Sequence, residues 1–134
     1  MGQKPAVRRD GDQAWETWSE KDRSRGGRVY WKTLISKGLT ASENLTLGIY
    51  CVPPGETLRA HRHRQEEIYL VLQGHGLIRV GDEELNVEAG SEVFIPGDAL
   101  HSCKNTGVAD LRVAYVFPTG SFDEVEYVFE HRAR

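Results

Sequence analysis

Three histidines and one glutamate in the middle of the chain are the residues best suited to bind a metal. His61 and His63 are two positions apart, Glu67 follows after a short gap, and His101 comes later. Alternate residues of a strand face the same side, so the first two imidazoles would point the same way. Three imidazoles and one carboxylate suit a first-row divalent metal. We predict that these four residues bind one divalent ion (Fe, Mn, Ni, Co, Cu or Zn) with coordination positions left for substrate or water.

Two further histidines stand apart from this set. His75 and His131 have no second ligand-type residue at a comparable spacing. An isolated histidine is most often a polar surface residue, and we interpret both in that way.

The sequence around the candidate ligands has the residue pattern of strands joined by turns. From residue 28 onward, β-branched and aromatic residues alternate with others in short runs, which indicates strands. Glycine, proline and aspartate separate these runs, as in Pro53-Pro54-Gly55 and Gly81-Asp82. About ten short strands are expected, the last over Val125–Phe129, and no helix of core length after residue 28. This spacing favours an all-β sandwich or barrel.

The first 27 residues differ in composition. They are polar and rich in arginine, aspartate and glycine, and we interpret them as a solvated arm. Trp15 and Trp18 are three apart, as on one face of a helical turn, and are expected to pack on the barrel or on a second subunit. We predict one domain over residues 28–134, preceded by this arm.

Composition excludes several classes of protein. The formal net charge is −3, which does not suit a nucleic-acid binder. No apolar run reaches the length of a membrane span, and the first residues lack the apolar core of a secretory signal. Cys51 and Cys103 form no disulfide framework. We therefore expect a cytoplasmic protein with no nucleic-acid or membrane partner.

The spacing of the ligands resembles the two signature motifs of the cupin superfamily, GX5HXHX3-4EX6G and GX5PXGX2HX3N. The matching residues are Gly55, His61, His63, Glu67, Gly74, Gly90, Pro96, His101 and Asn105. One position departs, since Gly97 directly follows Pro96 where the motif has one residue between them. The resemblance implies a double-stranded β-helix, or jelly-roll barrel, with the metal held inside by His61, His63, Glu67 and His101. Glycines at the motif ends are expected at turns with positive φ.

A closer similarity is to small bacterial cupin lyases that cleave dimethylsulfoniopropionate (DMSP) to acrylate and dimethyl sulfide. The similar segments are 28–35, 67–69, 117–119 and 124–127. In that family a tyrosine two residues beyond the ligand glutamate is proposed to act in catalysis, and Tyr69 has that position here. Tyr127 matches a second pocket tyrosine. Both are predicted catalytic residues for a β-elimination, with a tyrosine as base.

Two residues are predicted to contact substrate because of their parity on a strand. Arg59 shares parity with His61 and His63 and could clamp a substrate carboxylate. Cys103 shares parity with His101, where it either lines the pocket or fills the core.

Three functions remain open at this stage, since cupin membership does not determine activity. The first is a DMSP-type lyase. The second is another metal-dependent enzyme on a small molecule, such as a dioxygenase or an isomerase. The third is a binding protein for a sugar or other small ligand without catalysis. A homodimer is expected, with the strands near Val29–Ile35 and Val125–Phe129 as docking elements, because unpaired edge strands need covering.

Overall fold

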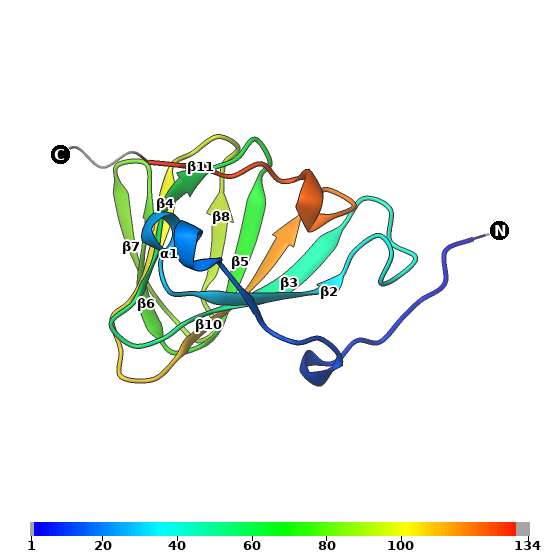
Figure 1. Cartoon of the computed structure of the whole chain (residues 1–134), viewed down its shortest axis with the longest axis horizontal. Helices are drawn as coiled ribbons and strands as arrows, with labels where there is room; N and C mark the ends of the chain where they lie inside the picture. Colours follow the sequence, from blue (N-terminus) through cyan, green and yellow to red (C-terminus); the bar gives the residue numbers. More distant parts are fainter. Residues whose placement is uncertain (1, 131–134) are drawn as a thin grey trace.

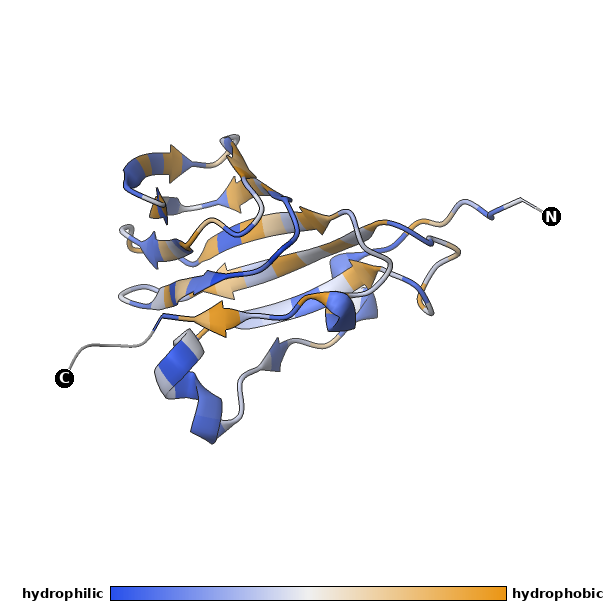
Figure 2. Ribbon diagram, turned by 90° about the horizontal axis from the view of Figure 1, so that it is seen from above, coloured by the Kyte–Doolittle hydropathy of each residue, from blue (hydrophilic) through white to orange (hydrophobic). Residues whose placement is uncertain are grey.

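The computed structural model describes residues 2–130, so His131 lies outside the described residues. Its strands follow from the alternation of residue types. Figure 2 shows hydrophilic and hydrophobic residues alternating along most of them. In β5, for example, Glu67, Tyr69 and Val71 are buried while Ile68 and Leu70 are exposed. Each strand therefore presents one face to a shared interior.

Eleven strands among the described residues form two antiparallel sheets (Figure 1). The first sheet runs, in spatial order, β1 (Glu16–Thr17), β2 (Tyr30–Ile35), β3 (Thr46–Val52), β10 (Leu111–Phe117), β5 (Glu67–Gln73) and β8 (Glu92–Ile95). The second runs β11 (Val128–Phe129), β4 (Thr57–Arg62), β9 (His101–Asn105), β6 (His75–Val80) and β7 (Glu83–Glu88). The non-consecutive order confirms the predicted all-β jelly roll.

Helical structure is short and lies near the two ends of the chain. The helix α1 (Glu20–Gly26) and the 3-10 turn η1 (Asp10–Asp12) precede the main strands, and η2 (Phe122–Glu124) follows β10. The predicted final strand over Val125–Phe129 was too long, because only its last two residues pair with β4. No helix among residues 2–130 combines the length and apolarity needed to cross a bilayer.

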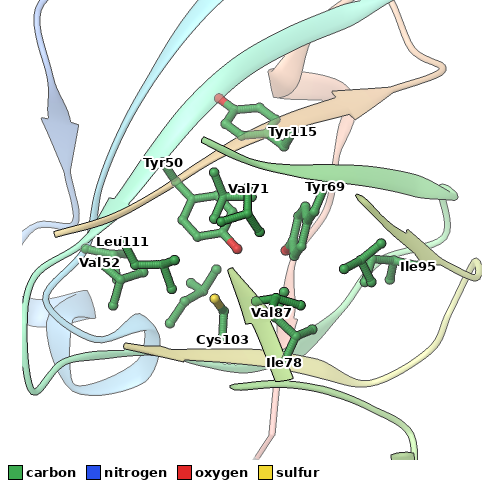
Figure 3. Close-up of a cluster of buried hydrophobic side chains, with 14 of the residues drawn as sticks. Tyr50, Val52, Tyr69, Val71, Ile78, Val87, Ile95, Cys103, Leu111 and Tyr115 are labelled. Carbon is green, nitrogen blue, oxygen red and sulfur yellow. The ribbon is translucent and has the colours of Figure 1, made fainter. Parts of the chain in front are cut away.

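The core lies between the two sheets and extends from the apolar end of the barrel to the histidines. Figure 3 shows Tyr50, Val71 and Leu111 of the first sheet facing Ile78 and Cys103 of the second. All five are buried, and three of them are fully inaccessible to solvent. Close packing of this kind fixes the directions in which the neighbouring polar side chains point.

A bulge in β4 changes which of its residues face the interior. Leu58 pairs with Cys103 and His61 with His101, so three steps along β4 correspond to two along β9. Leu58 and His61 are both buried although they differ in parity. The alternation on which the prediction for Arg59 rested is therefore broken at Arg59 and Ala60.

The turns match the motif positions. Gly55, Gly74 and Gly90 have positive φ, as predicted. The departure at Gly97 also has a structural reason. The motif's glycine position is held here by Asp98, the only non-glycine residue among residues 2–130 with positive φ, at 62°. Aspartate tolerates this left-handed conformation better than most residues, so the turn before His101 keeps its shape.

Trp15 and Trp18 are on extended chain flanking β1, and the expected helical turn is absent from the described structure at this point. Residues three apart in extended chain point to opposite sides. Trp18 packs at the edge of the core against Trp31, with ring centroids 4.6 Å apart. Trp15 lies on the outside over the ammonium of Lys32, 4.2 Å from ring centroid to Nζ. Both tryptophans therefore pack on the barrel.

Candidate metal centre and pocket

The four predicted ligands come together at one end of the barrel interior. His61 is in β4 and stands opposite His101 at the start of β9, while His63 follows the end of β4 and Glu67 begins β5. All four side chains are at most 2% exposed. Burial of four polar groups side by side is costly unless they are paired or bind an ion.

The outer ring nitrogens of the histidines are held by backbone carbonyls. Nδ1 of His61 is 2.7 Å from the oxygen of Arg59, that of His101 is 2.8 Å from Ala99, and that of His63 is 3.0 Å from Gln65. A carbonyl oxygen only accepts, so each Nδ1 must carry the proton and donate it. The lone pair of each neutral imidazole is thereby left on Nε2, the arrangement typical of metal-binding histidines.

The inner nitrogens converge without satisfying one another. Nε2 of His61 and Nε2 of His101 are buried and have no hydrogen-bond partner among the described residues. Oε1 of Glu67 lies 3.1 Å from Nε2 of His63 and 3.4 Å from Nε2 of His101. An unprotonated Nε2 and a carboxylate oxygen are both acceptors, so a proton or a cation must lie between them to make these contacts favourable.

The spacing fits a metal ion. The ligand atoms of the three histidines lie within 4.8 Å of one another. Two ligand atoms bound at right angles to one ion, each at about 2.1 Å, are about 3 Å apart, which is close to the Glu67 distances. The three histidines can thus hold a transition metal. Glu67 lies outside this group of three but close to His63 and His101, and it stays a predicted fourth ligand.

Electrostatics keep the site ready for a cation. Burial, followed by the neighbouring His101 and His63, holds the pKa of His61 well below its usual value. An imidazole with a depressed pKa stays neutral and keeps its lone pair at physiological pH. Protons therefore compete weakly for this ligand.

A small pocket adjoins the ligands and has mostly aromatic walls. Its volume is about 20 Å³. Its lining comprises Trp18, Val29, Trp31, Tyr50, Leu58, Glu67, Tyr69, Tyr115, Phe122 and Tyr127. Of the ligands, Glu67 is the one in its wall. The space is about that of a single water molecule, so a larger ligand must displace side chains to enter.

Both predicted catalytic tyrosines line this pocket. The ring of Tyr127 stacks on His61, with centroids 4.6 Å apart and planes at 6°, and that of Tyr69 is 6.1 Å from His101. Burial, followed by the charge of Glu67, raises the pKa of each tyrosine well above its ordinary value. In the metal-free chain both are therefore neutral phenols near pH 7.

The two predicted substrate contacts lie elsewhere. Arg59 lines an outer depression together with Arg23 and Arg28, because the bulge in β4 turns it away from the histidine side. Cys103 is fully buried in the core, and burial raises the pKa of its thiol to about 12. Of the two alternatives for Cys103, lining the pocket or filling the core, the structure supports the second.

Several pocket residues were not predicted from the sequence. Tyr50, from the strand before β4, and Trp18, from the segment before α1, are examples. β3 is buried on both faces over residues 48–52, so alternation along the strand could not have decided whether Tyr50 faces the barrel interior. Trp18 was expected to pack on the barrel or on a second subunit, and the structure places its ring on the barrel, but nothing in the sequence indicated that it would line this pocket.

The fold and the buried histidines define a class of protein, a small jelly-roll barrel with an internal site that can hold a metal. The chain belongs to the cupin family, since residues 48–117, more than half of its length, match the model of the cupin domain.

Relatives within this family differ in what they do. The chain is 41% identical over 103 residues to the dimethylsulfoniopropionate lyase DddW of Ruegeria pomeroyi, which covers 77% of this chain and 67% of that protein. It is 32% identical to an oxalate-binding protein of Thermotoga maritima, over 65% of this chain and 74% of the other. A crystal structure of a predicted oxalate decarboxylase from Thermotoga maritima superposes with a TM-score of 0.73 at 28% identity, covering 85% of this chain and 99% of that one.

Proposed function

We propose that this chain is a metal-dependent lyase that cleaves DMSP, or a closely related β-sulfonio carboxylate, to an acrylate and a dialkyl sulfide. The observation that carries the proposal is the buried pocket in which Tyr69 and Tyr127 adjoin Glu67 and the histidines. The 41% identity to a DMSP lyase supports it.

The reaction is a β-elimination. A base removes the proton from the carbon next to the carboxylate, the carbon–sulfur bond breaks, and dimethyl sulfide leaves with the bonding electron pair as the double bond forms. A divalent cation held by His61, His63, Glu67 and His101 would polarise the substrate carboxylate and offset the negative charge of Glu67 beside the tyrosines.

The side chains of the pocket divide the remaining work. Tyr69 and Tyr127 are the ionisable groups closest to the reacting end, and either can take the proton once its pKa is lowered toward neutrality. The aromatic faces of Trp18, Trp31 and Phe122 suit the positive sulfonium group, because ring faces attract cations. Their packing also excludes water from the site.

Entry of the substrate requires the aromatic cover to move. The pocket has room for about one water molecule, so DMSP cannot enter it unless side chains move. The segment bearing Phe122 and Tyr127 is joined to the barrel through β11, which pairs with β4 only at Arg62 and His61. We propose that this segment opens together with the Trp18 side chain to admit the substrate.

The test is release of dimethyl sulfide from DMSP by metal-loaded protein, measured in the headspace under air and under nitrogen. Equal release in both atmospheres is expected, because elimination consumes no oxygen. One of the two tyrosines is the proposed base. Its replacement, in Tyr69→Phe or Tyr127→Phe, should lower kcat by about 100-fold or more. Tyr115→Phe is the matched control. Metal-loaded protein that releases no dimethyl sulfide contradicts the proposal.

A second candidate is binding of a small organic acid without turnover. The similarity to an oxalate-binding protein favours it. In that case Tyr69→Phe would leave the affinity for oxalate unchanged.

A dioxygenase is distinguished from both candidates by its need for oxygen. It would require a redox metal, and its activity would stop under nitrogen.

A further inference from the structure

The hydroxyl group of Tyr50 is a buried polar atom that the metal centre does not use. Tyr50 is 5% exposed and lies in β3, on the sheet that faces the histidines. Its hydroxyl has no hydrogen-bond partner among the described residues. An unsatisfied buried hydroxyl is destabilising and uncommon, and often marks a functional requirement.

The surroundings of this hydroxyl explain why it stays unpaired. Its polar neighbours are the thiol of Cys103 and the hydroxyl of Tyr69. Both lie close enough to exchange pKa shifts with Tyr50, but neither contact meets the distance and angles of a hydrogen bond. Figure 3 shows the hydroxyls of Tyr50 and Tyr69 turned to the same part of the interior. The two rings meet edge to face with centroids 5.2 Å apart, which holds Tyr50 in place.

Tyr115 provides an internal comparison. It stacks on Tyr50, with centroids 6.4 Å apart, yet its hydroxyl points the other way (Figure 3). That hydroxyl contacts Oγ1 of Thr33 at 3.3 Å and donates to the carbonyl of Lys32 at 3.4 Å. Of these two neighbouring buried tyrosines, only Tyr115 has a hydroxyl with hydrogen-bond partners among the described residues.

We propose that Tyr50 is a binding residue whose hydroxyl donates a hydrogen bond to the carboxylate of a small organic acid in the pocket beside Glu67. Tyr50 and Glu67 line the same pocket, so a carboxylate held at the metal centre lies within reach of that wall. Burial raises the pKa of Tyr50 well above its ordinary value, which keeps the hydroxyl protonated as a donor. The inference rests on the proposed function in taking a carboxylate as the ligand.

The experiment compares Tyr50→Phe with Tyr115→Phe, using sodium acrylate as the probe and calorimetry on metal-loaded protein. Tyr50→Phe should weaken acrylate binding by about tenfold or more, because a hydrogen bond to a charged group is lost. The ring of Tyr115 also lines the pocket, but its hydroxyl points away from it, toward Thr33 and Lys32. Tyr115→Phe keeps the ring and should therefore leave the dissociation constant within about twofold of the original.

Thermal unfolding without acrylate should rank the variants in the opposite order. Tyr50→Phe removes an unsatisfied group, so its Tm should stay the same or rise. Tyr115→Phe loses fold contacts, and its Tm should fall by about 3 °C. A purely structural role for Tyr50 would lower the Tm of both variants.

The proposal is overturned if Tyr50→Phe binds acrylate as the original chain does, if it unfolds earlier as Tyr115→Phe should, or if the original metal-loaded chain has no affinity for acrylate. Failure of the proposed function is a separate result. Acrylate binding that depends on Tyr50, without dimethyl sulfide release from DMSP, would contradict the lyase and retain the carboxylate contact.

Discussion

At the scale of single residues, the metal centre depends on which atoms carry protons. The backbone carbonyls of Arg59, Gln65 and Ala99 accept a proton from each Nδ1. This leaves the Nε2 lone pairs free for a metal, with those of His63 and His101 beside Glu67. Each of these carbonyls is two residues away from its histidine in the sequence. The local backbone conformation around each histidine therefore selects its tautomer.

The depressed pKa of His61 predicts acid sensitivity of the metal-free chain. Its pKa is lower in the folded chain than the ordinary value of 6.5, so the unfolded chain takes up the proton first as pH falls. The stability that this group contributes is complete above pH 6.5 and is lost as pH falls below it. Urea unfolding of metal-free protein from pH 8 to pH 5 should show this decline. His61→Gln should flatten it, and an unchanged slope in this variant would contradict the assignment.

The cysteine thiols give a second prediction at this scale. Burial raises the pKa of Cys51 to about 11 and that of Cys103 to about 12. Only the thiolate reacts readily, so neither residue should be alkylated by iodoacetamide at pH 8 while the chain is folded. Mass spectrometry before and after unfolding in urea measures this. Rapid labelling of Cys103 in the folded protein would instead place it in an accessible pocket.

At the scale of elements, strands and turns were predictable, but local irregularities were not. Alternation located β3, β5 and β10, and the glycine and proline positions located the turns between them. Arg59 was misplaced because a bulge is invisible to a two-residue period. The helix α1 was missed, since its residues are polar and its one buried residue is Gly26.

The cover of the pocket also escaped sequence analysis, because it joins segments from both ends of the chain. Trp18 contacts Tyr127 and Phe129, with ring centroids 6.2 Å and 5.5 Å apart. The four candidate metal ligands, by contrast, were predicted from their spacing and its resemblance to the cupin motifs, and the structure groups the three histidines, with Glu67 beside two of them. Pairwise packing between distant segments leaves no comparable pattern in the sequence.

Replacement of Trp18 tests the role of this cover. Trp18→Ala should lower the free energy of unfolding by about 2–3 kcal/mol, since a half-buried aromatic ring leaves a cavity at the edge of the core. Trp15→Ala is the matched control. Its ring is 41% exposed, and loss of its contact with Lys32 should cost about 0.5–1 kcal/mol. Equal losses in urea denaturation would mean that Trp18 does not close the pocket.

At the scale of the whole molecule, the edges expected to dock a second copy are partly covered within one chain. The strand β1 pairs with β2, and β11 pairs with β4. Exposed apolar side chains lie instead on the outer face of the first sheet, at Ile68, Leu72 and Phe94 among others. The homodimer therefore stays a prediction, with this outer face as a further place for contact.

Light scattering coupled to size exclusion at micromolar concentration measures the assembly directly. The prediction is a particle of twice the 15.1 kDa chain mass. Phe94→Asp should shift it toward the monomer if the outer face takes part, because a buried carboxylate without a partner is costly. A single species of the chain mass in the unmodified protein would contradict the dimer.

The most direct test of the account is the metal content of protein purified without a polyhistidine tag, after loading with Mn, Fe, Ni or Zn and removal of free ions. We predict about one ion per chain, and loss of that ion in His61→Ala and His101→Ala, since these variants remove Nε2 ligands that have no other partner. His75→Ala, whose ring is exposed on β6, should retain it. A folded chain that holds no ion after loading, or one whose ion survives both ligand replacements, would contradict the metal centre itself.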